Sequence, residues 1–140
     1  MPKIEIYVDG SFSPTKQMYG CGAVILVDGK IVRELSIPGT EKDFNKYHNV
    51  AGEVFAALTA FMYVQQFHPE ADDVTCYYDY AGLELWATGK WNANSSLAIG
   101  YKESLAALPF TPKFVHVKAH TGVTYNERAD MLARKAVGLD

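Results

Sequence analysis

The chain has 140 residues, 49% of them hydrophobic, and its 13 basic and 16 acidic residues leave a net charge of −3. This length suits one domain with its own core, the composition excludes a disordered chain, and the charge excludes a uniformly basic nucleic-acid-binding surface. We therefore expect a single domain over residues 1–140, in which any nucleic acid would be held by a local patch or through metal ions.

Two cysteines, Cys21 and Cys76, lie in apolar runs and lack the spacing of metal ligands. They are interpreted as buried free thiols, which suit a reducing compartment. The sequence contains no signal peptide and no apolar run of about 18 residues, the length that crosses a membrane. A cytoplasmic protein without membrane contact is expected.

The N-terminal third of the chain has the pattern of an antiparallel meander. Apolar and polar residues alternate from Lys3, and Asp28-Gly29 between two apolar runs is typical of a two-residue hairpin turn. The polar stretch 39–45 is interpreted as a loop. The three predicted strands cover residues 3–9, 19–27 and 30–38.

Helices and strands alternate in the rest of the chain. Apolar residues follow helical spacing from Val50 onwards, and Pro69 closes that segment. Further helices are predicted over residues 80–88, 97–108 and 124–137, and short strands over 74–78 and 114–117. Three strands followed by this alternation predict an α/β fold with a mixed sheet covered by helices.

Four acidic residues occupy matched positions in these elements. Asp9 and Asp79 each end a predicted strand, and Glu53 and Asp130 lie early in helices, beside their apolar stripes. Taken singly, each has an ordinary interpretation as a turn or a solvated helix face. Together they are four carboxylates beside inward-packing residues, with few lysines or arginines nearby. That combination predicts a divalent metal site.

One histidine stands out by its position. His120 lies in a glycine-bearing loop that leads directly to Asp130, where it would suit proton transfer near a metal ion. The other three histidines, His48, His68 and His116, are interpreted as surface or core residues, with His116 inside the last strand.

With these motifs, the chain resembles the type 1 ribonuclease H family from Lys3 to about Lys135. The matching pieces are Tyr-Val-Asp9-Gly-Ser, Asn49-Val-Ala-Gly-Glu53, Tyr-Tyr-Asp79, Val-Lys-Ala-His120-Thr-Gly and Asn126-Glu-Arg-Ala-Asp130. The segment after Tyr77 is similar to the bacterial branch that is often fused to a viroplasmin-like hybrid-binding domain. We expect the ribonuclease H catalytic domain alone here.

The resemblance implies a ribonuclease H-like fold, with a five-stranded mixed sheet flanked by helices. It also implies a monomer that hydrolyses the RNA strand of RNA–DNA hybrids with two Mg²⁺ ions, which Mn²⁺ can replace, leaving 5′-phosphate and 3′-hydroxyl ends. In the family, the match for Asp9 bridges both ions and the match for Asp130 holds the ion that activates water. The matches for Glu53 and Asp79 hold the other ion, on the leaving-group side.

The resemblance also implies substrate contacts, which it assigns to Gly10, Ser11, Asn49 and Asn126. Asn49 matches a residue that contacts the RNA 2′-hydroxyl, and Asn126 a polar residue near the activating ion, although a plain first-turn helix role suits Asn126 equally. Departures from the family are Val50, where many members have asparagine, and Ala81, where many have glutamine. Trp86 and Trp91 lie in a short segment where some members carry a basic protrusion; they could stack on sugar or pack in the core.

Two other readings compete with a hybrid-specific endoribonuclease. One is a different nuclease on the same fold, against which the motifs around Asn49 and His120 argue. The other is a catalytically weak or silent nucleic-acid-binding domain, which would have no need to keep four unpaired carboxylates together.

Overall fold

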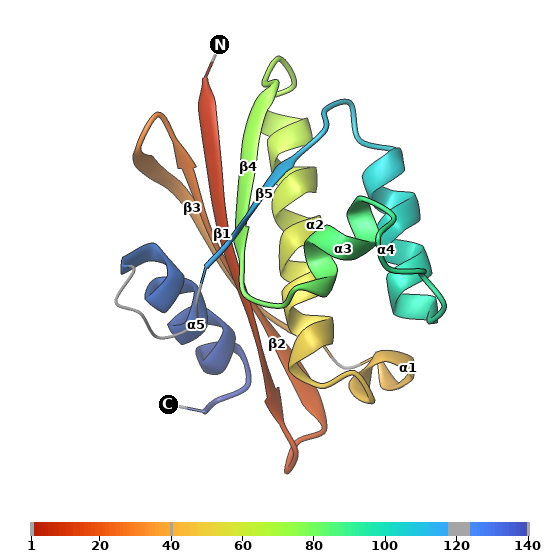
Figure 1. Ribbon diagram of the computed structural model, residues 1–140. Helices are drawn as coiled ribbons and strands as arrows, with labels where there is room; N and C mark the ends of the chain where they lie inside the picture. Colours follow the sequence, from red (N-terminus) through yellow and green to blue (C-terminus); the bar gives the residue numbers. More distant parts are fainter. Residues whose placement is uncertain (1, 40, 118–123, 140) are drawn as a thin grey trace.

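The computed structural model describes residues 2–39, 41–117 and 124–139 (Figure 1). Its described strands form one sheet in the order β3-β2-β1-β4-β5. β1, β2 and β3 pair antiparallel, whereas β4 and β5 run parallel to β1, so the predicted mixed sheet is confirmed. The strands are β1 (Lys3–Ser13), β2 (Met18–Val27), β3 (Lys30–Gly39), β4 (Asp73–Tyr78) and β5 (Lys113–His116).

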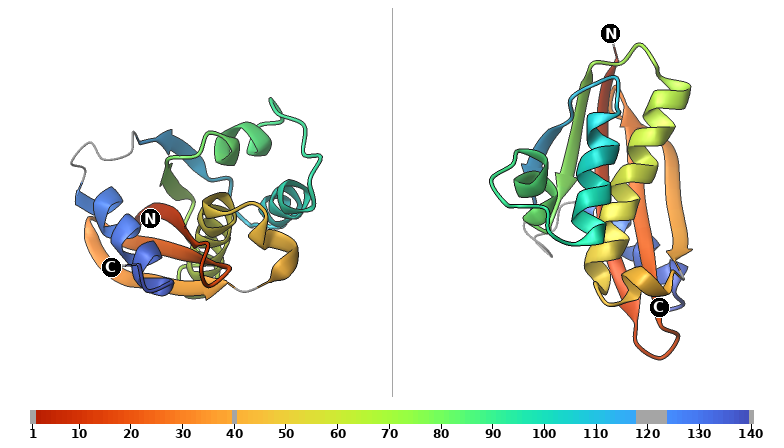
Figure 2. Two further views of the ribbon diagram at one scale, coloured as in Figure 1. Left: turned by 90° about the horizontal axis from the view of Figure 1, so that it is seen from below. Right: turned by 90° about the vertical axis from the view of Figure 1, so that its right-hand side faces the viewer.

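Helices cover both faces of this sheet (Figure 2). α2, α3 and α4 lie on one side and α5 lies alone on the other. The short α1 falls inside the stretch that the sequence predicted as a loop, because four residues are too few to show a helical period. The helices are α1 (Lys42–Asn45), α2 (Asn49–Phe67), α3 (Gly82–Ala87), α4 (Ser96–Ala106) and α5 (Thr124–Ala136).

The predicted hairpin turn between β2 and β3 is confirmed. Asp28 and Gly29 have φ angles of 50° and 82°, the left-handed pair that a two-residue turn of this kind requires. The turn fixes the register of β3 against β2, and β2 in turn runs beside β1 along its whole length.

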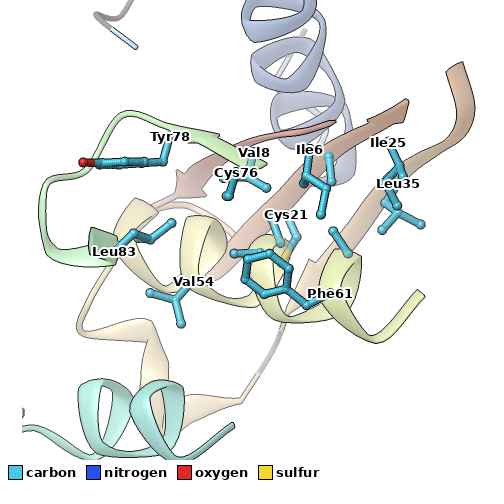
Figure 3. Packing of buried hydrophobic residues seen from close by; sticks show 14 of the residues in the cluster. Ile6, Val8, Cys21, Ile25, Leu35, Val54, Phe61, Cys76, Tyr78 and Leu83 are labelled. Carbon is cyan, nitrogen blue, oxygen red and sulfur yellow. The ribbon is translucent and has the colours of Figure 1, made fainter. Parts of the chain in front are cut away.

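The main hydrophobic core lies between the sheet and α2 (Figure 3). Ile6, Val8 and Cys76 of the strands lie on the side of the sheet that faces α2, which carries Val54 and Phe61, and all five side chains are fully buried. Cys21 and Cys76 are both buried free thiols, as the sequence predicted.

The first strand does not end at Asp9, as the sequence predicted, but continues to Ser13. Its pairing with β2 runs as far as Ser13, whereas its pairing with β4 stops at Tyr7. Asp9 therefore lies inside β1, but beyond Tyr7, the last β1 residue that pairs with β4. Tertiary pairing on one side prolongs the strand, which the local sequence could not reveal.

α5 approaches β2 so closely that one strand position has no room for a side chain. A Cβ atom at Gly22 would lie 2.1 Å from the carbonyl oxygen of Ala129 and 2.5 Å from the amide nitrogen of Ala133. Gly100, within α4, is the opposite case, since a Cβ there meets nothing within 4 Å.

Gly22→Ala should lower the free energy of unfolding by about 1–3 kcal/mol or more, because the helix backbone must move. Gly100→Ala should raise it by about 0.5–1 kcal/mol, because glycine is costly inside a helix and the space is free. Urea unfolding of both variants beside the wild type measures these changes. Equal stability of the two variants would contradict the close packing of α5 on β2.

Candidate active site

The predicted site begins where the first turn of α2 meets β1. A Cβ atom at Gly10 would lie 2.0 Å from the carbonyl oxygen of Asn49 and 2.4 Å from the amide nitrogen of Glu53. Only glycine permits this approach of two backbones. The contact places Glu53 of the helix beside Asp9 of the strand.

Glu53 is the most deeply buried acidic residue of the described chain, with 2% of its surface exposed. Its carboxylate accepts hydrogen bonds from the backbone amides of Asp79, at 2.8 Å, and Tyr80, at 3.1 Å. Burial raises the pKa of Glu53 to about 7, although the two amides oppose this shift. These two hydrogen bonds link Glu53 of α2 to the residues that follow β4.

Asp9 lies between carboxylates from two other elements. Burial, the charge of Glu53 and the charge and hydrogen-bonding side chain of Asp130 together raise the pKa of Asp9 to about 8. Its own neighbour Gly10 donates a backbone hydrogen bond to Oδ1 at 2.9 Å, which only partly offsets the shift. Without a cation, the Asp9 carboxyl therefore holds a proton near neutral pH.

Asp79 directly follows the last residue of β4 and is anchored through its backbone. Its amide donates to Glu53, and its carbonyl oxygen lies 2.8 Å from Nε2 of His116 on β5. His116 lies in the last strand, as predicted, but no sequence pattern indicated this contact. The parallel pairing of Tyr78 with His116 could have indicated it, had the register been known.

Glu53 thus adjoins Asp9 and Asp79, and Asp130 adjoins Asp9, all four close to the point where the pairing of β1 with β4 stops. Within residues 2–39, 41–117 and 124–139, no three acidic, histidine or cysteine side chains converge closely enough to hold one metal ion as they stand. In this part of the chain, the cationic side chain that lies within 4 Å of one of these four carboxylates is that of Arg134, 3.9 Å from Asp130.

This donor set suits a hard divalent cation. All four groups offer carboxylate oxygens, which Mg²⁺ and similar ions prefer. Burial is the main cause that raises the pKa of Asp9 and Glu53, and the neighbouring acidic groups add to it. A bound cation would favour the charged form of both carboxyls.

The predicted substrate-contacting residues are spread around this cluster. Asn49 is exposed at the start of α2, next to Gly10, and Ser11 is half-buried two residues after Asp9. Asn126 is only 5% exposed in the first turn of α5, a setting that also suits the plain helix role. His120 lies outside the described residues, so its role stays a prediction.

An aromatic group extends from the site along α3. The ring of Tyr80 lies 5.6 Å from that of Trp86 and 6.3 Å from that of Trp91. Trp86 packs against the core and also against Tyr101, whereas Trp91 is 41% exposed. The two tryptophans therefore differ in the roles that the sequence suggested. Trp86 is a packing residue, whereas the ring of Trp91 is accessible to a ligand.

Solved structures that match this fold include ribonucleases H. RNase H1 from the halophilic archaeon Halobacterium salinarum NRC-1 matches with a TM-score of 0.75 and 26% identity, covering 96% of this chain and 97% of that one. LC11-RNase H1 in complex with RNA/DNA hybrid matches with a TM-score of 0.73 and 22% identity, over 96% and 99% of the two chains. The architecture is therefore that of a ribonuclease H.

The sequence gives the family as well. The RNase H family model matches residues 1–138, so this chain belongs to the RNase H family. Ribonuclease H of Neorickettsia sennetsu is 32% identical over 148 residues, covering 96% of this chain and 93% of that protein. Ribonuclease H of Bartonella quintana is 31% identical, covering 96% and 88%. The family resemblance seen in the motifs is confirmed, and the family acts with divalent metal ions.

In the described part of the chain, no helix is both long and apolar enough to cross a membrane.

The raised pKa values predict how stability depends on pH. Asp9 and Glu53 titrate near 8 and 7 in the folded protein but near 4 in the unfolded chain, so the folded state binds more protons between these values. The free energy of unfolding should therefore fall as pH rises from about 4 to about 8. Asp9→Asn should weaken this fall and be more stable than the wild type at pH 8.

Urea unfolding in EDTA, at steps from pH 5 to pH 8, measures the effect. Asp72→Asn, at an exposed position, is the matched control and should follow the wild type. Parallel curves for Asp9→Asn and the wild type would show that Asp9 carries no such strain.

Proposed function

We propose that this protein hydrolyses the RNA strand of RNA–DNA hybrids as an endoribonuclease that leaves 5′-phosphate and 3′-hydroxyl ends. Two divalent ions, Mg²⁺ or in its place Mn²⁺, would be held by Asp9, Glu53, Asp79 and Asp130. Such ions stabilise the attacking and departing oxygens of a phosphodiester displacement when bound. The protein would act as a monomer.

One observation carries the proposal most directly: buried Glu53 of α2 lies against β1 at Gly10, next to Asp9, and accepts a hydrogen bond of 2.8 Å from the amide of Asp79. Acidic residues from a helix and two strands thus meet in one place, and burial together with these acidic neighbours raises the pKa of Asp9. Carboxylates grouped in this way suit divalent cations.

The chain's own residues prepare the site in distinct ways. Glu53 is fixed by two backbone amides and so keeps its orientation without any ligand. Asp9 must release its proton before it can bind a cation, so binding near neutral pH should release protons. His116 holds the carbonyl of Asp79 and supports the strand end from the other side.

Recognition of RNA would rest on the exposed N-terminus of α2. Asn49 lies there beside the cluster and can reach a 2′-hydroxyl, the group that distinguishes RNA from DNA. Relatives with solved structures support the substrate class, since LC11-RNase H1 was solved with an RNA/DNA hybrid. The exposed ring of Trp91 is available for stacking on the nucleic acid.

A panel of end-labelled duplexes tests the function. RNA–DNA hybrid should be cut in its RNA strand with Mg²⁺ or Mn²⁺ and not with EDTA, while duplex DNA and duplex RNA stay intact. Asp79→Asn should abolish cleavage yet keep hybrid binding, because one ligand is weakened in an otherwise intact pocket. Cleavage of duplex DNA at the same rate would favour another nuclease, and binding without any cleavage would favour the silent domain.

His120→Ala should slow turnover of the hybrid by a factor of about 10²–10⁴, the range of a lost proton-transfer group. His68→Ala is the matched control, since His68 lies at the far end of α2 and should leave turnover unchanged. Single-turnover kinetics at saturating Mg²⁺ compares the two. An unchanged rate in His120→Ala would make His120 an ordinary loop residue.

A further inference from the structure

Three tyrosines to which the sequence assigned no role lie two to five residues before acidic residues of the cluster: Tyr7, Tyr77 and Tyr125. Tyr7 and Tyr77 form the last residue pair of the ladder between β1 and β4. Two residues further along each strand come Asp9 and Asp79. Because side chains alternate with a period of two, Tyr7 and Asp9 leave β1 on the same face of the sheet.

The rings of this pair are stacked. Their centroids lie 4.3 Å apart with an interplanar angle of 6°, and the hydroxyl of Tyr77 donates to Glu5 of β1 at 3.0 Å. Burial and Glu5 raise the pKa of Tyr77 to about 12, so this hydroxyl remains a donor at neutral pH. The stack and the hydrogen bond tie β1 to β4 at the point where their ladder ends.

The third ring, that of Tyr125, belongs to α5, the helix that carries Asp130. Tyr125, in the first turn of α5, lies 5.4 Å from Tyr7 at an angle of 48°. One turn later, Ala129 rests on Gly22 of β2, and Asp130 is the next residue. α5 is held against the sheet along its length, since Ala133 also lies against Gly22 and the hydroxyl of Ser36 on β3 donates to the carbonyl of Leu132 at 2.7 Å. Tyr125 adds a ring contact with β1, the strand that carries Asp9.

We propose that Tyr7, Tyr77 and Tyr125 form an aromatic brace that positions the carboxylates of Asp9, Asp79 and Asp130 for binding of divalent cations. The inference rests on the proposed metal site. The three residues act through packing, so they are positioning residues that need touch neither ion nor substrate. Each ring belongs to a different acidic element, and the brace is the point where all three elements meet.

The contacts of α5 differ in the strand that they reach. Those at Ala129, Ala133 and Leu132 hold the helix against β2 and β3. The ring of Tyr125 holds its first turn against Tyr7 of β1, the strand that carries Asp9, and so sets the position of Asp130 relative to Asp9. Hydrogen-bonded groups that orient metal ligands are worth about 10–100-fold in metal affinity, and the lower end of that range is expected for a packing contact.

Calorimetric titration of the free protein with Mn²⁺ tests the brace without relying on turnover. Tyr125→Ala should weaken Mn²⁺ binding about tenfold or more and raise by a similar factor the Mg²⁺ concentration needed for half-maximal cleavage. Tyr125→Phe keeps the ring and should restore both to within about twofold. Tyr63→Ala is the control, because it removes a ring paired with Phe67 at 4.7 Å on α2, away from the site. It should leave Mn²⁺ affinity unchanged, even where it lowers the melting temperature.

Each outcome decides the matter. Wild-type Mn²⁺ affinity in folded Tyr125→Ala would overturn the brace and leave the proposed function standing. Absence of Mn²⁺ binding by the wild type would overturn the proposed function and the brace with it. If Tyr125→Ala does not fold, Tyr125→Leu, which keeps apolar bulk but no ring, takes its place: weakened binding supports the brace and unchanged binding overturns it.

Discussion

The burial of one carboxylate governs the arrangement of the whole site. Glu53 is 2% exposed on the helix that covers the main core, and its charge can stay there only because the backbone amides of Asp79 and Tyr80 point at it. These hydrogen bonds dock the end of β4 onto α2. The aromatic group around Tyr80 begins at this contact.

Close backbone contacts at glycine positions set the remaining distances. Gly10 lets α2 approach β1 from one face, and Gly22 lets α5 approach β2 from the other. A side chain at either position would push a helix outward. Carboxylates borne on the two helices would then separate from Asp9, so packing density and the electrostatics of the site are linked.

The acidic groups of the resulting site lie close enough to interact through their charges. Asp9 responds by keeping a proton near neutral pH, because burial and its acidic neighbours raise its pKa to about 8. Supporting contacts come from uncharged groups: backbone amides at Glu53, a histidine nitrogen at the Asp79 carbonyl, and stacked tyrosine rings where the pairing of β1 with β4 stops. Such groups fix geometry without neutralising the cluster, which leaves that task to a ligand.

The sequence by itself determined the elements and the identity of the acidic residues. Hydrophobic periods gave the helices and strands, and Asp28-Gly29 gave the hairpin, because these depend on local chemistry. Position within each element singled out Asp9, Glu53, Asp79 and Asp130. Only the tertiary structure decided that β1 continues past Asp9 and that His116 supports Asp79. It alone also decided that tyrosines from two strands and a helix meet near the site. These features arise from pairing register and helix docking between segments far apart in the chain, which no local pattern records.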